Sequence, residues 1–171
     1  MCEFCLNTAR CTINDVSGPD LKALRQTLDD ADTQRFLPEL CSEFPTADSL
    51  HLLVYPMLLA QVNAHFESGR GFFWSIRREE TMVGLVVLMY LNTHPTLYFA
   101  THPDHRRQGY MKETLLRVIE FARKEYLFPK LYAEVPTEDN AAATLLRVLG
   151  FRETSVENGM SFRELELYED D

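Results

Sequence analysis

The stretch His105-Arg106-Arg107-Gln108-Gly109-Tyr110-Met111 is the most informative part of this chain. It joins a strand-like run, residues 96–101, to a helix-like run, residues 109–126. A helix that begins directly after a strand leaves its first backbone N–H groups unpaired and points the positive end of its dipole past the strand. The glycine has no Cβ to keep a bulky anion away, and the two arginines before it add cationic donors. The stretch therefore predicts a binding site for a diphosphate.

The rest of the chain predicts one sheet with helices around it. The only clear strand–helix–strand crossover carries the anion loop, and ligands of open α/β sheets gather at the carboxyl ends of such strands. The Asn-Gly pair at 158–159 predicts a tight hairpin, and Pro56 is expected to kink or split a long helix. The predicted elements are a strand at 10–16, a helix that begins at Ser17 and includes 21–28, a helix at 46–67, strands at 72–77, 82–90 and 96–101, a helix at 109–126, a strand at 130–135, a helix at 140–149, and strands at 151–157 and 160–168.

Length and composition limit the possible classes of protein. The chain has 171 residues, of which 46% are hydrophobic, so a single globular domain over 1–171 with a real core is expected. The N-terminus Met1-Cys2-Glu3-Phe4-Cys5 lacks a signal-peptide pattern, and no apolar run reaches the roughly 18 residues of a membrane span. We therefore expect a cytoplasmic monomer or homodimer without a membrane partner. The net charge of −9 opposes nucleic-acid binding and mildly favours cationic substrates such as amines.

Three of the four cysteines, Cys2, Cys5 and Cys11, lie close to the N-terminus, and the fourth is Cys41. The first two have the spacing of half a zinc site, but a full site needs four ligands and no histidine lies near. The chain is therefore expected to hold reduced thiols in a mobile terminus and no metal.

Two motifs resemble those of the GNAT superfamily of acyl-CoA-dependent N-acetyltransferases. Arg106-x-x-Gly109-x-Met111 resembles the family's Arg/Gln-x-x-Gly-x-Gly/Ala phosphate loop, with Met111 in place of the usual small last residue. The run from Asp139 to Phe151 is similar to the family's Asn-x-x-Ala-x-x-Leu-Tyr-x-x-x-Gly-Phe helix. Residues 32–38, 73–76 and 83–84 extend the resemblance, which is strongest to the branch that includes ribosomal-protein N-terminal acetyltransferases. A nucleotide P-loop lacks its Gly-Lys-Ser/Thr here, and a dinucleotide fold lacks its three glycines.

The resemblance implies an α/β class with a GNAT-like mixed sheet, mostly antiparallel, flanked by helices. At its centre a pair of parallel but splayed strands, 96–101 and 130–135, would open a slot. It further implies that acetyl-CoA is the cosubstrate, with its diphosphate on the loop amides and its pantetheine arm beside the strand. The residues expected to bind it are Phe99, Ala100, Thr101, Arg106, Arg107, Gln108, Gly109, Tyr110, Met111, Asp139 and Asn140.

Glu134 is the predicted general base. Alternation along its strand places Leu131, Ala133 and Val135 on one face and Glu134 on the other. A carboxylate in an apolar strand needs a partner or a task, burial would raise its pKa, and relatives carry a catalytic glutamate there. A solvated or salt-bridged glutamate is the competing interpretation.

His102 and His105 on the loop are further candidates for a proton relay, since an unperturbed histidine titrates near pH ~6.5. Plain surface histidines are the alternative. Of the two, His102 joins Glu134 in the predicted catalytic set.

The predicted function is direct transfer of an acetyl group from acetyl-CoA to a primary amine, with no covalent enzyme intermediate. Two positions depart from active relatives: Thr96 stands where some have a glutamate base, and Leu146 where many have a tyrosine acid. The alternative is therefore a catalytically silent CoA-binding or regulatory module. The amine stays open between a peptide N-terminus, a polyamine, an aminoglycoside and a small amino acid.

Overall fold

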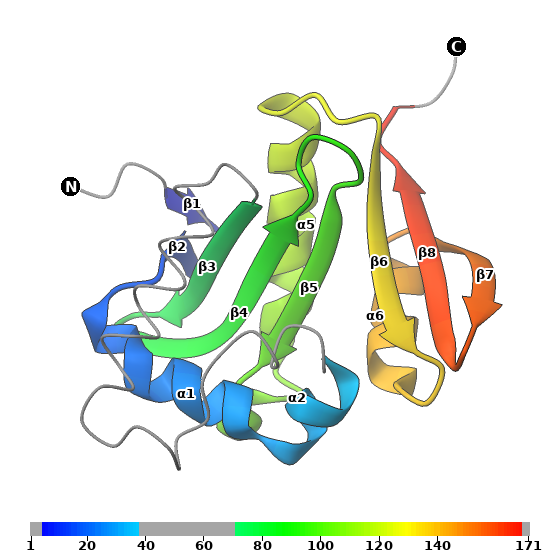
Figure 1. The fold of residues 1–171 in the computed structure, drawn as a ribbon. Coiled ribbons are helices and arrows are strands. Elements are labelled where there is room, and N and C mark those ends of the chain that lie inside the picture. Colours follow the sequence, from blue (N-terminus) through cyan, green and yellow to red (C-terminus); the bar gives the residue numbers. More distant parts are fainter. Residues whose placement is uncertain (1–4, 38–70, 169–171) are drawn as a thin grey trace.

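The structure is a computed structural model, in which residues 5–37 and 71–168 are described (Figure 1). One eight-stranded sheet runs through this part of the chain, in the order β1-β2-β3-β4-β5-β6-β8-β7. Every neighbouring pair is antiparallel except β5 and β6, which are parallel. The strands are β1 (Cys5–Asn7), β2 (Thr12–Asp15), β3 (Gly71–Arg78), β4 (Thr81–Met89), β5 (Thr96–Thr101), β6 (Lys130–Pro136), β7 (Arg152–Glu157) and β8 (Met160–Glu166).

Helices cover both faces of the sheet. On one face lie α5 (Tyr110–Lys124) and α6 (Asn140–Val148), which Figure 1 shows behind the strands. On the other lie α1 (Leu21–Asp29) and α2 (Ala31–Phe36). Each face has its own core: Leu115, Val118 and Leu146 belong to the first, and Leu24 and Leu28 to the second.

The sheet opens between its two parallel strands. The register joins only Thr96 with Tyr132 and Leu97 with Ala133. Beyond these pairs β5 continues along β4 as far as Thr101, and β6 continues along β8 as far as Pro136. Figure 1 shows β5 and β6 diverging toward α2. The predicted splayed pair and the predicted mixed, mostly antiparallel class are therefore confirmed.

Several local sequence patterns predicted the corresponding elements correctly. Asn158 and Gly159 have φ of 52° and 77°, as a type I′ hairpin turn requires. Leu21, Leu24 and Leu28 are buried on one face of α1 as predicted. A short 3-10 helix, η1 (Gly18–Asp20), precedes α1, and the capping residue before it, Ser17, donates its backbone N–H to Asp20 Oδ2 at 2.9 Å.

The N-terminal segment differs from the prediction. Cys5 belongs to β1, an edge strand that pairs with β2, and Cys11 is a buried core residue, so these thiols are not in a loose terminus. Burial raises the pKa of the Cys11 thiol, which keeps it in the protonated form at neutral pH. The helix α2 and the strand β1 were not predicted, while the predicted helix at 46–67, Cys2 and Cys41 lie outside the described residues. Among the described helices, none has the length and apolar character that crossing a bilayer would require.

Candidate active site

A cavity of about 510 Å³ occupies the gap between β5 and β6. Its walls come from both faces of the sheet: Leu97 and Phe99 belong to the core beneath α5, whereas Tyr98 and Ala100 belong to the core beneath α1. The cavity thus crosses the sheet where backbone pairing stops. The predicted residues that line it are Phe99, Ala100, Thr101, Arg106, Arg107, Gln108, Gly109, Tyr110, Met111, Glu134 and Asp139.

The loop before α5 has the backbone of an anion site. Arg107 has φ of 62° and Gly109 has φ of 80°, two left-handed positions that turn successive N–H groups to one side. Gly109 is the N-terminal cap of α5 and has no side chain to occupy the first N–H groups of the helix. Met111 packs in the core beneath α5 and also lines the cavity. The amides beside Arg107 are therefore available to an acceptor such as phosphate.

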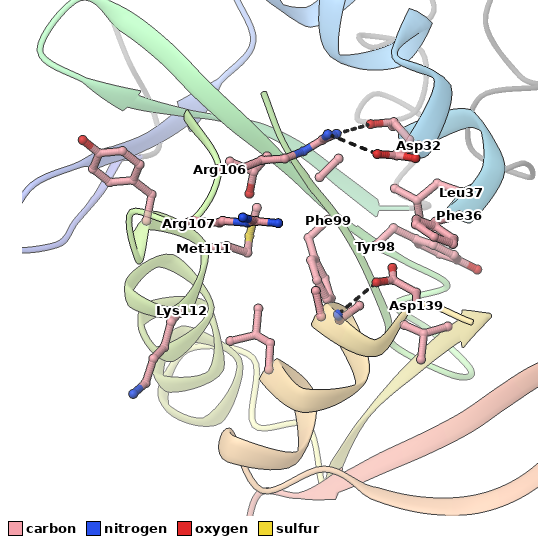
Figure 2. A pocket seen from close by; sticks show the side chains of 18 of the residues that line it. Asp32, Phe36, Leu37, Tyr98, Phe99, Arg106, Arg107, Met111, Lys112 and Asp139 are labelled. Carbon is pink, nitrogen blue, oxygen red and sulfur yellow. Dashed lines mark hydrogen bonds and ion pairs between the residues drawn. The ribbon is translucent and has the colours of Figure 1, made fainter. Parts of the chain in front are cut away.

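Arg106 was predicted to bind the cosubstrate, but its side chain is directed toward α2. Its guanidinium hydrogen-bonds Asp30, and its Nη1 lies 3.6 Å from Asp32 Oδ2. Figure 2 shows the side chain reaching toward α2, while Arg107 stays above the start of α5. Burial acts to raise the pKa of the Asp30 carboxyl, but hydrogen bonds from Arg106 and the Thr33 amide outweigh it and leave this pKa lowered. Arg106 thus ties the loop to α2, and of the two arginines only Arg107 stays on the side of the loop amides.

The β5 edge that faces the gap can be assigned from hydrogen bonds at its two ends. Pro95 O accepts from the Tyr132 N–H of β6 at 2.9 Å, and the His102 N–H donates to Val83 O of β4 at 2.8 Å. Since backbone groups alternate sides along a strand, odd-numbered residues of β5 face β6 and even-numbered ones face β4. Phe99 and Thr101 therefore present their N–H and C=O groups to the cavity, and Ala100 lines it while its backbone pairs with β4.

Glu134 lies on the β6 side of the cavity. The alternation predicted for its strand holds: Leu131, Ala133 and Val135 are buried in the core beneath α5, and Glu134 is half-buried on the opposite side. Its strand position is opposite Phe162 of β8. The carboxylate thus comes from the face of the sheet that α1 and α2 cover, at the gap itself.

Asp139 is a second carboxylate at this end of β6. It is the N-terminal cap of α6 and accepts a hydrogen bond from the Ala142 N–H at 3.1 Å, which Figure 2 shows as a dashed line. Burial raises the pKa of this carboxyl above its ordinary value. Asn140, its neighbour in the predicted set, is not among the residues that line the cavity.

The two histidines of the loop, His102 and His105, lie in different surroundings. His102 is buried outside the cavity, where its Nε2 lies 3.1 Å from Gln26 Oε1 and its Nδ1 accepts from the Asp104 N–H at 3.2 Å. Burial lowers the pKa of its imidazole, so the neutral form is favoured. The geometry gives no support to a direct proton relay by His102. His105 does line the cavity.

Several wall residues were not predicted from the sequence, among them Phe36 at the end of α2, Leu37 directly after it, and Tyr98 of β5. Figure 2 draws these side chains in one group, on the same side of the view as Asp139. For Tyr98 the available signal was strand alternation, which puts it on the same face of the sheet as Ala100. For Phe36 it was only the family resemblance of 32–38, because a helix of six residues has too few turns for a periodic pattern.

The two positions that depart from active relatives are Leu146, which is apolar and buried, and Thr96, whose hydroxyl is hydrogen-bonded. Leu146 is fully buried in the core beneath α5, and Leu145 lines the cavity instead. Thr96 is buried, and its hydroxyl donates to His94 O at 2.7 Å. Neither side chain offers a proton to the cavity.

The comparison with protein families decides the family. The model described as "Acetyltransferase (GNAT) domain" matches residues 10–152. The chain belongs to the GNAT acetyltransferase family. In this GNAT domain the loop before α5, the splayed strands β5 and β6 and the N-terminal end of α6 surround one cavity. No curated protein matches its sequence significantly.

Solved structures share the fold at low sequence identity. Spermidine N-acetyltransferase from Vibrio cholerae, in complex with CoA and spermine, has a TM-score of 0.75 at 17% identity, over 93% of this chain and 96% of that one. RimL, a ribosomal L7/L12 α-N-protein acetyltransferase in complex with coenzyme A, has a TM-score of 0.76 at 11% identity, over 95% and 98%. Mycobacterium smegmatis RimJ, in complex with CoA-disulfide, has a TM-score of 0.70 at 13% identity, over 91% and 81%. These likenesses show that this GNAT chain has the same fold.

Proposed function

We propose that this chain is an N-acetyltransferase that moves an acetyl group from acetyl-CoA to a primary amine, either a protein N-terminus or a small amine. Transfer is direct, in a ternary complex. The observation that carries the proposal is the cavity that crosses the sheet, with the loop amides at the start of α5 on one side and Glu134 on the other. Family membership supports the same cosubstrate, since GNAT acetyltransferases use acetyl-CoA.

The phosphate loop and β5 fit the donor. Amides around Arg107 and Gly109 face outward at a helix N-terminus, where a diphosphate is favoured by both hydrogen bonding and the dipole. The free backbone edge at Phe99 and Thr101 would pair with the amides of the pantetheine arm. A volume of about 510 Å³ is within the usual range for small-ligand sites.

Acetyl-CoA supplies an acetyl thioester, which the gap would hold between the two splayed strands. The N–H groups of β5 that face the gap are placed to meet negative charge as it develops on the carbonyl oxygen. These donors are fixed by the strand, because β5 is held along its other edge by β4 as far as Thr101. Fixed donors need no reorganisation during the reaction.

Glu134 is the proposed general base. A protein α-amino group has a pKa near ~8 and an alkyl amine one near ~10.4, so most of the acceptor must lose a proton before it attacks. The half-buried carboxylate lies on the face of the sheet that is opposite α5, so the amine would enter from the side of Phe36, Leu37 and Tyr98. The donor and acceptor would then approach the gap from opposite faces.

The departing thiolate has no tyrosine acid here, since Leu146 is in the core. An ordinary thiol has a pKa near ~8.5, so the thiolate is a fair leaving group near neutral pH. Water at the open end of the cavity can return the proton.

The second candidate function, a silent CoA-binding module, rests on the same two positions: Thr96 and Leu146 offer no acid or base. One experiment separates the candidates. Release of free thiol from acetyl-CoA is measured against a panel containing a polyamine, a peptide with a free N-terminus, an aminoglycoside and an amino acid, while calorimetry measures CoA binding.

The proposal expects CoA binding and thiol release that depends on at least one amine. CoA binding without turnover for any member of the panel would favour the silent module. Absence of CoA binding by the intact chain would overturn both functions.

A further inference from the structure

Arg10 lies between β1 and β2 in the sequence, yet its side chain reaches the phosphate loop. Its Nη1 donates to Gln108 O at 2.9 Å, and its Nε donates to Glu113 Oε1 at 2.9 Å. The guanidinium also lies over the ring of Tyr110, at 4.5 Å from the ring centre. A single residue from the edge of the sheet thus contacts the loop and two residues of the first turn of α5, Tyr110 and Glu113.

Glu113 completes this contact. Its Oε2 accepts from the Arg10 backbone N–H at 3.0 Å and from the Thr8 hydroxyl. Burial acts to raise the pKa of the Glu113 carboxyl, but the hydrogen bonds from Thr8 and Arg10 outweigh it and leave this pKa lowered. The carboxylate is therefore charged at neutral pH and bonded on both oxygens.

The position of Arg10 is unusual for a cation, because positive charge at a helix N-terminus is opposed by the helix dipole. The side chain is held there by Glu113 and by the face of Tyr110. It also supports the backbone directly: a Cβ added to Gly109 would lie 3.2 Å from Arg10 Nη2. Arg10 is thus packed against the back of the left-handed turn whose amides form the anion site.

Arg10 is not among the residues that line the cavity, so any effect on the ligand passes through the loop. We propose that Arg10, held by Glu113, is a positioning residue that fixes the conformation of loop 106–110 for the diphosphate of acetyl-CoA. This inference rests on the proposed function. It adds a residue from the N-terminal edge of the sheet to the donor site.

The experiment distinguishes positioning from simple attraction of charge. If Arg10 acted only as a positive charge, Arg10→Lys would keep CoA affinity, and Glu113→Gln would strengthen it by removing a negative charge near the diphosphate. If Arg10 positions the loop, Arg10→Lys should weaken CoA binding, because a single ammonium cannot make the several hydrogen bonds of a guanidinium. Glu113→Gln should then weaken CoA binding as well. The sign of the Glu113→Gln effect is therefore decisive.

CoA binding is measured by calorimetry for the intact chain and for Arg10→Gln, Arg10→Lys and Glu113→Gln. We expect each variant to raise the Kd by about tenfold, the order of magnitude for breaking a coupled charge network. Matched controls on the same helix are Arg117→Gln and Glu120→Gln, which remove the same charges from a partly exposed pair 3.5 Å apart that lies away from the loop. These controls are expected to leave the Kd unchanged, and thermal melts show which variants fold.

A tighter complex for Glu113→Gln, or an unchanged Kd for Arg10→Gln, overturns the positioning role while the proposed function stands. Pantetheine, which lacks the diphosphate, provides the second check. An equal loss of affinity for CoA and pantetheine would indicate a general structural defect and would also overturn the inference. Absence of CoA binding by the unmodified chain would instead overturn the proposed function, and this role with it.

Discussion

Under the proposed function the cavity has a donor side and an acceptor side, and the two are built in different ways. On the donor side the groups that face the ligand are mostly backbone: the turned loop at Arg107 and Gly109, and the free edge of β5. On the acceptor side they are side chains: Glu134 from β6, and Phe36 and Leu37 from the end of α2. A backbone site tolerates changes of sequence, whereas a side-chain site changes with every substitution. Under the proposed function, substitutions would therefore change the acceptor side more readily than the donor side.

The two sides are also joined differently to the rest of the molecule. The donor loop is held by Arg10, which hydrogen-bonds both Gln108 of the loop and Glu113 of α5. The helix α2 is held across the gap by ion pairs at both of its ends, Asp30 with Arg106 of the β5 side and Arg35 with Glu138 of the β6 side. Exposed pairs such as the second contribute little, about 0–1 kcal/mol. The acceptor side is therefore expected to be the more easily altered of the two.

The largest effect is expected at the acceptor carboxylate. Glu134→Gln should lower kcat by about 10² to 10⁴, the usual contribution of a general base, and should leave the Kd for CoA unchanged. Steady-state thiol release and calorimetry measure the two quantities. A variant that loses CoA affinity instead would place Glu134 on the donor side and break the comparison.

Gly109 tests the donor side by its backbone. Gly109→Glu forces a side chain into a φ of 80°, which costs about 1–2 kcal/mol, and adds a negative charge beside the diphosphate. Affinity for CoA should fall by about 100-fold, since each 1.4 kcal/mol is a factor of ten. Gly109→Ala, the matched variant without charge, should lose about tenfold. Equal affinities for the two variants and the intact chain would refute the assignment of the loop.

Asp139 tests whether the second carboxylate belongs to the chemistry. Asp139→Ala removes the cap of α6 and should cost about 1 kcal/mol of stability, whereas Asp139→Asn keeps a capping oxygen and should cost little. Thermal unfolding measures this difference. Activity should survive in Asp139→Asn; a loss as large as that of Glu134→Gln would make Asp139 the proton acceptor.

The smallest effect is expected at the tie between the loop and α2. Because the pKa of Asp30 is lowered in the folded state, its contribution to stability is fully present above its unfolded value near ~3.9. That contribution is lost as the pH falls through the lowered pKa. Asp30→Asn should therefore lower the Tm at pH 7, and the difference from the intact chain should shrink in acid. Asp104→Asn, at an exposed carboxylate, serves as the control.

Much of the donor side could be predicted from the sequence, for a physical reason. The bounds of β5 were predicted to the residue, and the loop before α5 was located. Each of these depends on residues close together in the chain. Local signals such as strand alternation and a glycine at a helix cap are therefore sufficient for this half of the cavity.

The rest depends on contacts between distant residues, which no local pattern encodes. Arg106 finds Asp30 76 residues earlier, and Arg10 finds Gln108 98 residues later. The strand β1 has three residues and is identified only by its pairing with β2. The placement of His102 against Gln26 likewise follows from how α1 packs on the sheet. The sequence alone does not show which of these residues contact one another.

The short parallel pairing has a consequence for the sheet as a whole. Within the described residues, two backbone pairs of the sheet join the block β1 to β5 with the block β6, β8 and β7. A pantetheine arm lying in the gap would take the place of a missing strand, because its amide groups can bond the exposed edge of β5. The bound cosubstrate would then join the two blocks of strands more firmly than the polypeptide does alone. Product release would remove that connection.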